Sequence, residues 1–160
     1  MGSFRRRVPL QSTATEDEAL ALLDSAAEPV TLIVDVDNTL VRQGARPDEF
    51  VAVVNRGLDR FEAHPMVARL IALSNGTQRG VSRIIGRGNK PWTSRRRLSL
   101  GRGENVWVIG DQVLTDGLLA WRVRAPFLHL VVSAEEPLRQ ARMRRYGRWL
   151  TPLLFDRGEK

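Results

Sequence analysis

The sequence predicts an α/β fold, a Rossmann-like three-layer sandwich in which helices cover both faces of a central parallel sheet. Two observations support this prediction. Short apolar runs rich in Val, Ile and Leu alternate along the chain with longer segments whose apolar residues recur at helical spacing. The clearest run, residues 30–36, is almost wholly apolar before its acids, which is typical of a strand buried on both sides.

The expected elements follow one another in a regular order. Strands are expected at residues 30–36, 67–73, 106–109 and 127–132. Helices are expected from a capping box at Thr13-x-x-Glu16 to Leu23, and at residues 48–63, 78–85, 92–100, 115–123 and 135–150. Strands and helices of this length in alternation favour parallel strand pairs joined by crossover helices.

The chain is expected to form one domain. A flexible basic segment is expected at residues 1–12, followed by a single domain over residues 13–160 that includes the basic C-terminal helix. The stretches 40–66 and 76–89 have room for about one helix each, so no large cap domain is expected. No internal repeat or long linker divides the chain.

Composition limits the chemistry. There is no cysteine, and the two histidines are too few for a histidine cage, so any metal would be held by oxygen ligands, which favours Mg²⁺. The net charge of +7 favours anionic partners without distinguishing nucleic acid, lipid headgroups and small phosphates. No apolar run reaches the roughly 18 residues of a membrane span, so we expect a cytoplasmic protein, with peripheral contact at the inner membrane surface left open.

Polar residues follow several of the predicted strands, at the edge of the sheet where ligands of such folds gather. They are Asp35, Asp37 and Thr39 after the first strand, Ser74 and Asn75 after the second, Lys90 in a glycine-rich loop, and Asp111 and Asp116 after the third. Each group alone would be an ordinary turn, helix cap or basic loop. Their ordered combination indicates a catalytic site.

The pair Asp35 and Asp37 suggests phosphoryl transfer. Two carboxylates so close at a strand end favour a bound cation, and with Mg²⁺ one can attack phosphorus while the other, protonated, supplies a proton to the leaving oxygen. Asp111 would add a metal ligand. Asp116 would ligate the metal directly or through water, steady Lys90, or cap a helix.

The motifs DVDNTL, LSNG, Lys90-Pro91 and GDQVLTD resemble, in order, those of the haloacid dehalogenase superfamily of phosphatases over residues 30–133. The residues of these motifs are most similar to those of the branch that dephosphorylates phosphatidylglycerophosphate. The resemblance implies a capless phosphatase with an aspartyl-phosphate intermediate. It implies that Asp35 is the nucleophile, Asp37 the acid and base, Thr39 the brace of the loop, Ser74, Asn75 and Lys90 the phosphate-binding residues, and Asp35, Asp37, Asp111 and Asp116 the Mg²⁺ ligands.

An open site suits a large anionic phosphomonoester such as a phospholipid. In the C-terminal helix, arginines are interleaved with Met143, Tyr146 and Trp149, which favours contact with an anionic membrane, although such a helix is equally typical of a solvated face. The same two interpretations apply to the run Arg95 to Arg97. The alternatives are a phosphatase of nucleic-acid ends or small metabolites, and a non-catalytic module that binds a phosphorylated ligand or a membrane surface.

Overall fold

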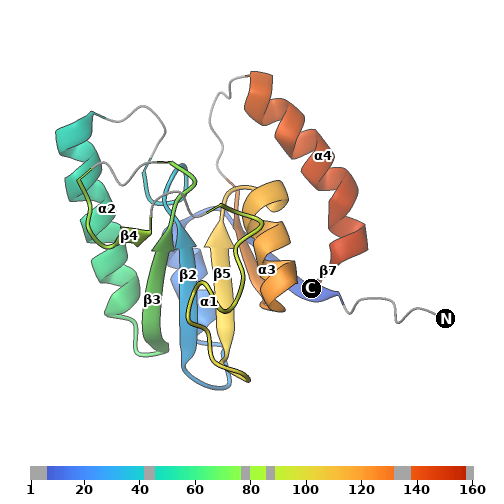
Figure 1. The fold of residues 1–160 in the computed structure, drawn as a ribbon, viewed down its shortest axis with the longest axis horizontal. Helices are drawn as coiled ribbons and strands as arrows, with labels where there is room; N and C mark the ends of the chain where they lie inside the picture. Colours follow the sequence, from blue (N-terminus) through green and yellow to red (C-terminus); the bar gives the residue numbers. More distant parts are fainter. Residues whose placement is uncertain (1–6, 42–45, 77–79, 86–88, 132–137, 158–160) are drawn as a thin grey trace.

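The computed structural model describes residues 7–41, 46–76, 80–85, 89–131 and 138–157. Over these residues the chain forms a seven-stranded sheet in which every strand pair is parallel, in the order β4-β3-β2-β5-β6-β1-β7 (Figure 1). The strands are β1 (Val8–Thr13), β2 (Val30–Asp35), β3 (Val67–Leu73), β4 (Ile84–Ile85), β5 (Val106–Gly110), β6 (Phe127–Leu130) and β7 (Phe155–Arg157). The predicted α/β class is confirmed.

Strand β2 lies at the centre of the sheet because its sequence suits burial on both faces. All six of its residues, VTLIVD, are buried, and it pairs with β3 on one side and β5 on the other. Successive side chains of a strand point to opposite faces. Leu32 and Val34 accordingly belong to one hydrophobic cluster and Ile33 to the other.

These two clusters separate the helices into two layers. Helices α1 (Glu16–Leu23) and α2 (Pro47–Glu62) bury residues such as Leu23 and Phe61 in the cluster that contains Leu32. Helix α3 (Leu118–Val123) buries Leu119 in the cluster of Ile33. Helix α4 (Leu138–Leu154) lies beyond α3 (Figure 1) and packs on the π-helical turn η1 (Val113–Gly117). The sheet is therefore covered on both faces, as predicted.

The beginning of the domain differs from the prediction. The prediction of a flexible segment over residues 1–12 is wrong for residues 8–12. These residues belong to β1, which pairs with both β6 and β7 and buries Val8 and Leu10. The short strand β7, which was not predicted, completes that edge. Residues 1–6 lie outside the described part of the chain.

The N-cap of the helix after β1 lies two residues later than predicted. Thr13 is the last residue of β1, where its carbonyl accepts a hydrogen bond from Val131 (2.7 Å). The N-cap is Thr15, whose hydroxyl accepts from the Glu18 N–H (3.2 Å), while the Glu18 carboxylate accepts from the Ala14 N–H (2.7 Å). A capping box is therefore present, but it begins at Thr15, because Thr13 belongs to β1.

Two expected helices are wrong. The described part of the segment 78–85 contains a turn and β4, which pairs with β3. Residues 92–100 form successive turns, and the Arg95 side chain there donates hydrogen bonds to the carbonyls of Val123 and Gly101 (both 2.8 Å). These tertiary contacts override the helical pattern of the sequence. The helix expected at 115–123 divides into η1 and α3.

The stretch between β2 and β3 contains one long helix, α2, and the described part of the chain has no large separate cap domain. Helix α4 extends to Leu154, beyond its predicted end, and residues 132–137 before it are outside the described residues. None of the described helices combines the length and apolar character needed to cross a bilayer.

Candidate active site

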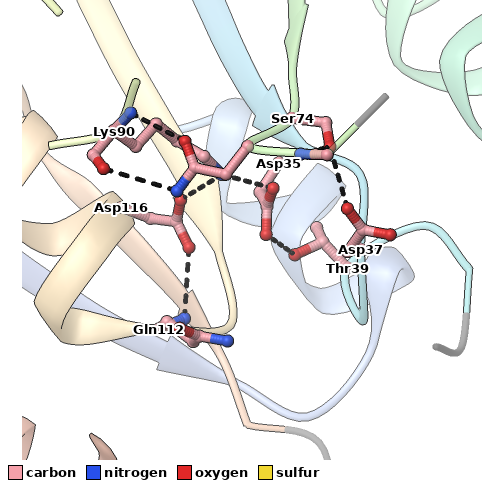
Figure 2. A network of polar contacts seen from close by, with 9 residues as sticks. Asp35, Asp37, Thr39, Ser74, Lys90, Gln112 and Asp116 are labelled. Carbon is pink, nitrogen blue, oxygen red and sulfur yellow. Dashed lines mark hydrogen bonds and ion pairs between the residues drawn. The ribbon is translucent and has the colours of Figure 1, made fainter. Parts of the chain in front are cut away.

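The candidate site lies at the carboxyl edge of the sheet, where β3, β2 and β5 end side by side. Asp35 is the last residue of β2, Ser74 follows β3 and Asp111 follows β5. The parallel pairing of these strands brings together residues that are far apart in the sequence. Figure 2 shows most of the resulting network.

Lys90 connects two carboxylates at the centre of the network. Its ammonium donates hydrogen bonds to Asp35 Oδ1 and to Asp116 Oδ1, the latter at 2.6 Å (Figure 2). All three side chains are buried, with residue exposures of 8% for Lys90, 6% for Asp35 and 1% for Asp116. Of the roles considered for Asp116, contact with Lys90 is the one seen directly.

Burial and charge act against each other in this group. Burial, and then the charge of Asp116, raises the pKa of the Asp35 carboxyl well above its ordinary value, although Lys90 acts in the opposite direction. Burial lowers the pKa of the Lys90 ammonium, but Asp116 and Asp35 together raise it above its ordinary value. Lys90 therefore stays charged, and the surrounding carboxylates still have an excess of negative charge.

Asp111 increases that excess. It is 5% exposed, and its Oδ1 atom is buried without a hydrogen-bond partner among the described residues. Burial, followed by the charge of Asp116, raises the pKa of the Asp111 carboxyl to about 7. A buried oxygen without a partner and a carboxyl with so high a pKa both indicate a place for a cation.

The residues present fit Mg²⁺. One carboxylate oxygen from each of Asp35, Asp111 and Asp116 lies within 4.8 Å of the others. Carboxylate oxygens are the ligands that a hard divalent cation prefers. Within the described residues a single ammonium, that of Lys90, contacts this carboxylate trio. A divalent ion would offset the remaining negative charge.

Asp37, also predicted as a metal ligand, has a different environment. Its carboxylate accepts a hydrogen bond from the Ser74 hydroxyl (2.8 Å) and is outside the carboxylate trio (Figure 2). The strand has ended before Asp37, and the chain turns back so that Asn38, with a φ of 61°, donates its N–H to the Val41 carbonyl (2.7 Å). Asp35 is thus the last residue of the strand, whereas Asp37 belongs to the loop that follows it.

Ser74, Thr39 and Asn75 support the two aspartates. Ser74 Oγ also accepts from the Gly76 N–H (2.9 Å), and the Thr39 hydroxyl lies 3.5 Å from Asp35 Oδ2. Asn75 contacts the Lys90 backbone twice: its amide donates to the carbonyl (3.3 Å), and its Oδ1 accepts from the N–H (2.7 Å). Asn75 thus holds the lysine loop, and the phosphate binding that the resemblance implies for it stays a prediction.

Sequence reasoning missed two supporting positions. The Gln112 N–H donates to Asp116 Oδ2 (3.2 Å; Figure 2) and so fixes the carboxylate opposite Lys90. A Cβ on Gly110 would lie 2.5 Å from the Asp116 carboxyl, so glycine is needed for this close approach. The signal available in the sequence was a glycine directly before the strand-end Asp111.

Comparisons with known proteins add no further assignment. No protein-family model matches the chain, and searches of the curated proteins and of the solved structures gave no match.

Proposed function

We propose that the protein is a magnesium-dependent phosphatase of the haloacid dehalogenase type that acts through an aspartyl-phosphate intermediate. The observation that carries the proposal is the carboxylate trio around Lys90, with the Asp37–Ser74 pair beside it at the same sheet edge. A site that only binds phosphate has no use for a second acid so close to a buried carboxylate. The ordered motifs support the same reaction.

In this proposal Asp35 is the nucleophile. Its carboxylate oxygen forms a bond to phosphorus as the bond from phosphorus to the leaving oxygen breaks, and Asp37 gives a proton to that oxygen. Water then attacks the phosphoryl group, Asp37 takes a proton from it, and phosphate leaves with the Asp35 carboxylate restored. Ser74 and Lys90 supply donors for the charge on the phosphoryl oxygens.

Mg²⁺ is the proposed cofactor. Asp35, Asp111 and Asp116 would hold the ion, which would balance their charge and that of the substrate phosphate. In this proposal the Asp37 carboxylate, which accepts a hydrogen bond from Ser74 outside that trio, serves proton transfer and is not needed to hold the ion. A chelator should therefore abolish turnover, and added Mg²⁺ should restore it.

The proposed substrate is a large anionic phosphomonoester, with phosphatidylglycerophosphate the first to test. The lack of a large cap domain over the described residues leaves room for such a molecule, and the net charge of +7 favours an anion. Nucleic-acid ends and small phosphorylated metabolites are the alternative substrates. A non-catalytic module that binds a phosphorylated ligand or a membrane is the alternative from another class.

Helix α4 supports a lipid substrate. Tyr146, Trp149 and Leu153 are exposed at helical spacing, by 63%, 72% and 58%, and the exposed Arg145 and Arg148 lie beside them. The side chains of Arg139, Arg142 and Arg144 are outside the described residues. An apolar stripe next to arginines suits an anionic membrane, so we propose a cytoplasmic enzyme that contacts the inner membrane surface.

A substrate screen tests the reaction. Turnover of an aryl phosphate, short-chain phosphatidylglycerophosphate, 5′-phosphorylated oligonucleotides and sugar phosphates is measured with Mg²⁺ and with chelator. Release of phosphate from none of them, by folded protein with Mg²⁺, would refute the proposal. Turnover of soluble phosphates without the lipid would refute only the lipid substrate.

Membrane contact is tested separately by sedimentation with vesicles. Wild-type protein should bind vesicles that contain anionic phospholipid, with less binding at high salt or in Trp149→Ser. The exposed Val53 on α2 offers the matched control Val53→Ser, which should bind as wild type does. Equal binding by all three proteins, or none by wild type, would contradict membrane contact through α4.

A further inference from the structure

A pocket lies next to Lys90, and the residues of the carboxylate trio are not among those that line it. Its volume is about 480 Å³, within the range of ligand sites, and the described residues that line it are Asn75, Asn89, Lys90 and Arg97. All four are polar, and two are cations. The pocket therefore suits an anionic group and offers little to an apolar one.

Arg97 is the cation of this pocket that has no partner. The Lys90 ammonium is already shared between Asp35 and Asp116. Among the described residues, no ion pair or hydrogen bond engages the Arg97 guanidinium, and the hydrogen bond of this residue is from its backbone N–H to Ser94 Oγ (3.2 Å). Its donors are free for a ligand.

The three consecutive arginines have different environments. Arg95 stabilises the fold, because its guanidinium donates hydrogen bonds to the carbonyls of Val123, Gly101 and Glu104. Arg96 and Arg97 are both exposed, but Arg96 does not line the pocket. Only Arg97 reaches the space beside Lys90. The structure thus separates one candidate binding residue from a run that looked uniform in the sequence.

We propose that Arg97 is a specificity-determining residue that binds a second phosphate group of the substrate, a phosphodiester, while the phosphomonoester is at Asp35. The proposal rests on the proposed function. A guanidinium presents paired N–H donors that match two phosphate oxygens, and its single charge matches that of a diester. Because Lys90 borders both the trio and the pocket, the two phosphates lie close together in one substrate.

Arg97 and Asp35 together define the class of substrate by the two phosphate groups that they bind. The preferred substrate carries a terminal phosphomonoester and, nearby, a phosphodiester, as in phosphatidylglycerophosphate or in a 5′-phosphorylated oligonucleotide. A sugar monophosphate or an aryl phosphate leaves Arg97 unpaired. Such compounds should react at the same centre with lower kcat/KM.

The test uses substrate pairs that differ by the diester. One pair is short-chain phosphatidylglycerophosphate and glycerol 3-phosphate, and the other is a 5′-phosphorylated dinucleotide and a 5′-mononucleotide. For each pair the ratio of kcat/KM, with diester over without, is measured in wild type, Arg97→Gln and Arg96→Gln. Melting temperatures show that each variant is folded.

We expect Arg97→Gln to lower the ratio by about tenfold to a hundredfold, mainly through KM, for the pair that carries the natural diester. Arg96→Gln should leave the ratio within about twofold of wild type, since Arg96 is exposed and does not line the pocket. The pair with the larger effect identifies lipid or nucleic acid as the source of the diester. An unchanged ratio in Arg97→Gln for both pairs, or an equal decrease in both variants, would overturn the proposal.

The same measurements distinguish an error in the proposed function from an error in the role of Arg97. Folded wild-type protein that releases no phosphate from any of the four compounds with Mg²⁺ refutes the phosphatase itself. Turnover with no role for Arg97 refutes only this inference.

Discussion

Asp35 and Asp37 are separated by one residue in the sequence, yet their surroundings in the structure are opposite. Asp35 ends a buried strand and contacts Lys90 within a group of three carboxylates. Asp37 is half-buried in the following turn and accepts a hydrogen bond from the neutral Ser74 hydroxyl. Two further carboxylates and an ammonium surround the first position, whereas a hydroxyl contacts the second.

The difference explains how two like side chains could serve two roles. Burial and Asp116 raise the pKa of Asp35, so its reactive, ionised form depends on Lys90 and on a cation among the three carboxylates. Asp37 is outside that group and beside Ser74, and in the proposed reaction it exchanges a proton with a substrate oxygen. The proposed nucleophile and the proposed acid are thus the same type of residue in two different environments.

The largest expected effect is that of Asp35→Asn. Loss of the nucleophile should lower kcat by about 10⁴-fold or more, and no phosphorylated protein should be trapped by rapid acid quench. Wild-type protein treated in the same way should show the acyl phosphate by mass spectrometry. Substantial activity in folded Asp35→Asn would assign the attack to another group.

Asp37→Asn should have a smaller effect that depends on the substrate. Without the acid, kcat for an alkyl phosphate should fall by about 10²- to 10⁴-fold, and for an aryl phosphate with an acidic leaving group by much less. Mg²⁺ affinity, measured by calorimetry, should stay close to that of wild type because Asp37 is outside the trio. Equal losses for both substrates, or a large loss of Mg²⁺ affinity, would remove the distinction between the aspartates.

Next in size is a dependence of stability on pH in the presence of chelator. The pKa of Asp111 is raised from 3.8 to about 7, chiefly by burial, so the folded state binds this proton more tightly than the unfolded state. Its stabilising contribution is full below pH 3.8 and is lost as pH rises through about 7. The free energy of unfolding should therefore fall by a few kcal/mol between about pH 4 and 7.

Thermal melting in chelator checks this dependence, with Asp111→Asn as the control that should weaken it. Added Mg²⁺ should raise the melting temperature more at pH 7.5 than at pH 5.5, since binding requires deprotonated ligands. A melting temperature independent of pH, or equal slopes in the two proteins, would contradict the assignment of Asp111.

The smallest predicted effect is that of Gly110→Ala. The added Cβ would meet the Asp116 carboxyl at 2.5 Å and displace it from Lys90 and from the Gln112 N–H. We expect Mg²⁺ affinity to fall by about tenfold, as for other groups that support metal ligands. Gly103→Ala is not a suitable control, because the φ of Gly103 is +82°.

Gly101→Ala is the matched control, since an added Cβ there meets only the Glu104 side chain, at 3.4 Å or more. It should leave Mg²⁺ affinity unchanged. If both variants bind Mg²⁺ as wild type does, the close approach at Gly110 has no role in the site.

Much of the fold follows from local sequence. The β2 and β3 strands and helix α2 were predicted within about a residue, because each has a clear apolar period and defined ends. The strands β1 and β7, the last two on one side of the sheet, were not predicted, since their few buried residues, such as Val8 and Phe155, form a pattern only once they pair. The segment 92–100 was misread because distant carbonyls bind Arg95.

By itself, the sequence determined the fold class and which strand ends carry Asp35, Ser74 and Asp111, because burial pattern and position along a strand are local properties. Tertiary structure alone decided that Asp37 pairs with Ser74 outside the carboxylate trio, that Asn75 holds the backbone of Lys90, and that Arg97 is the arginine of its run that lines the pocket beside Lys90. These outcomes depend on contacts between residues far apart in the chain, which periodicity and spacing do not encode.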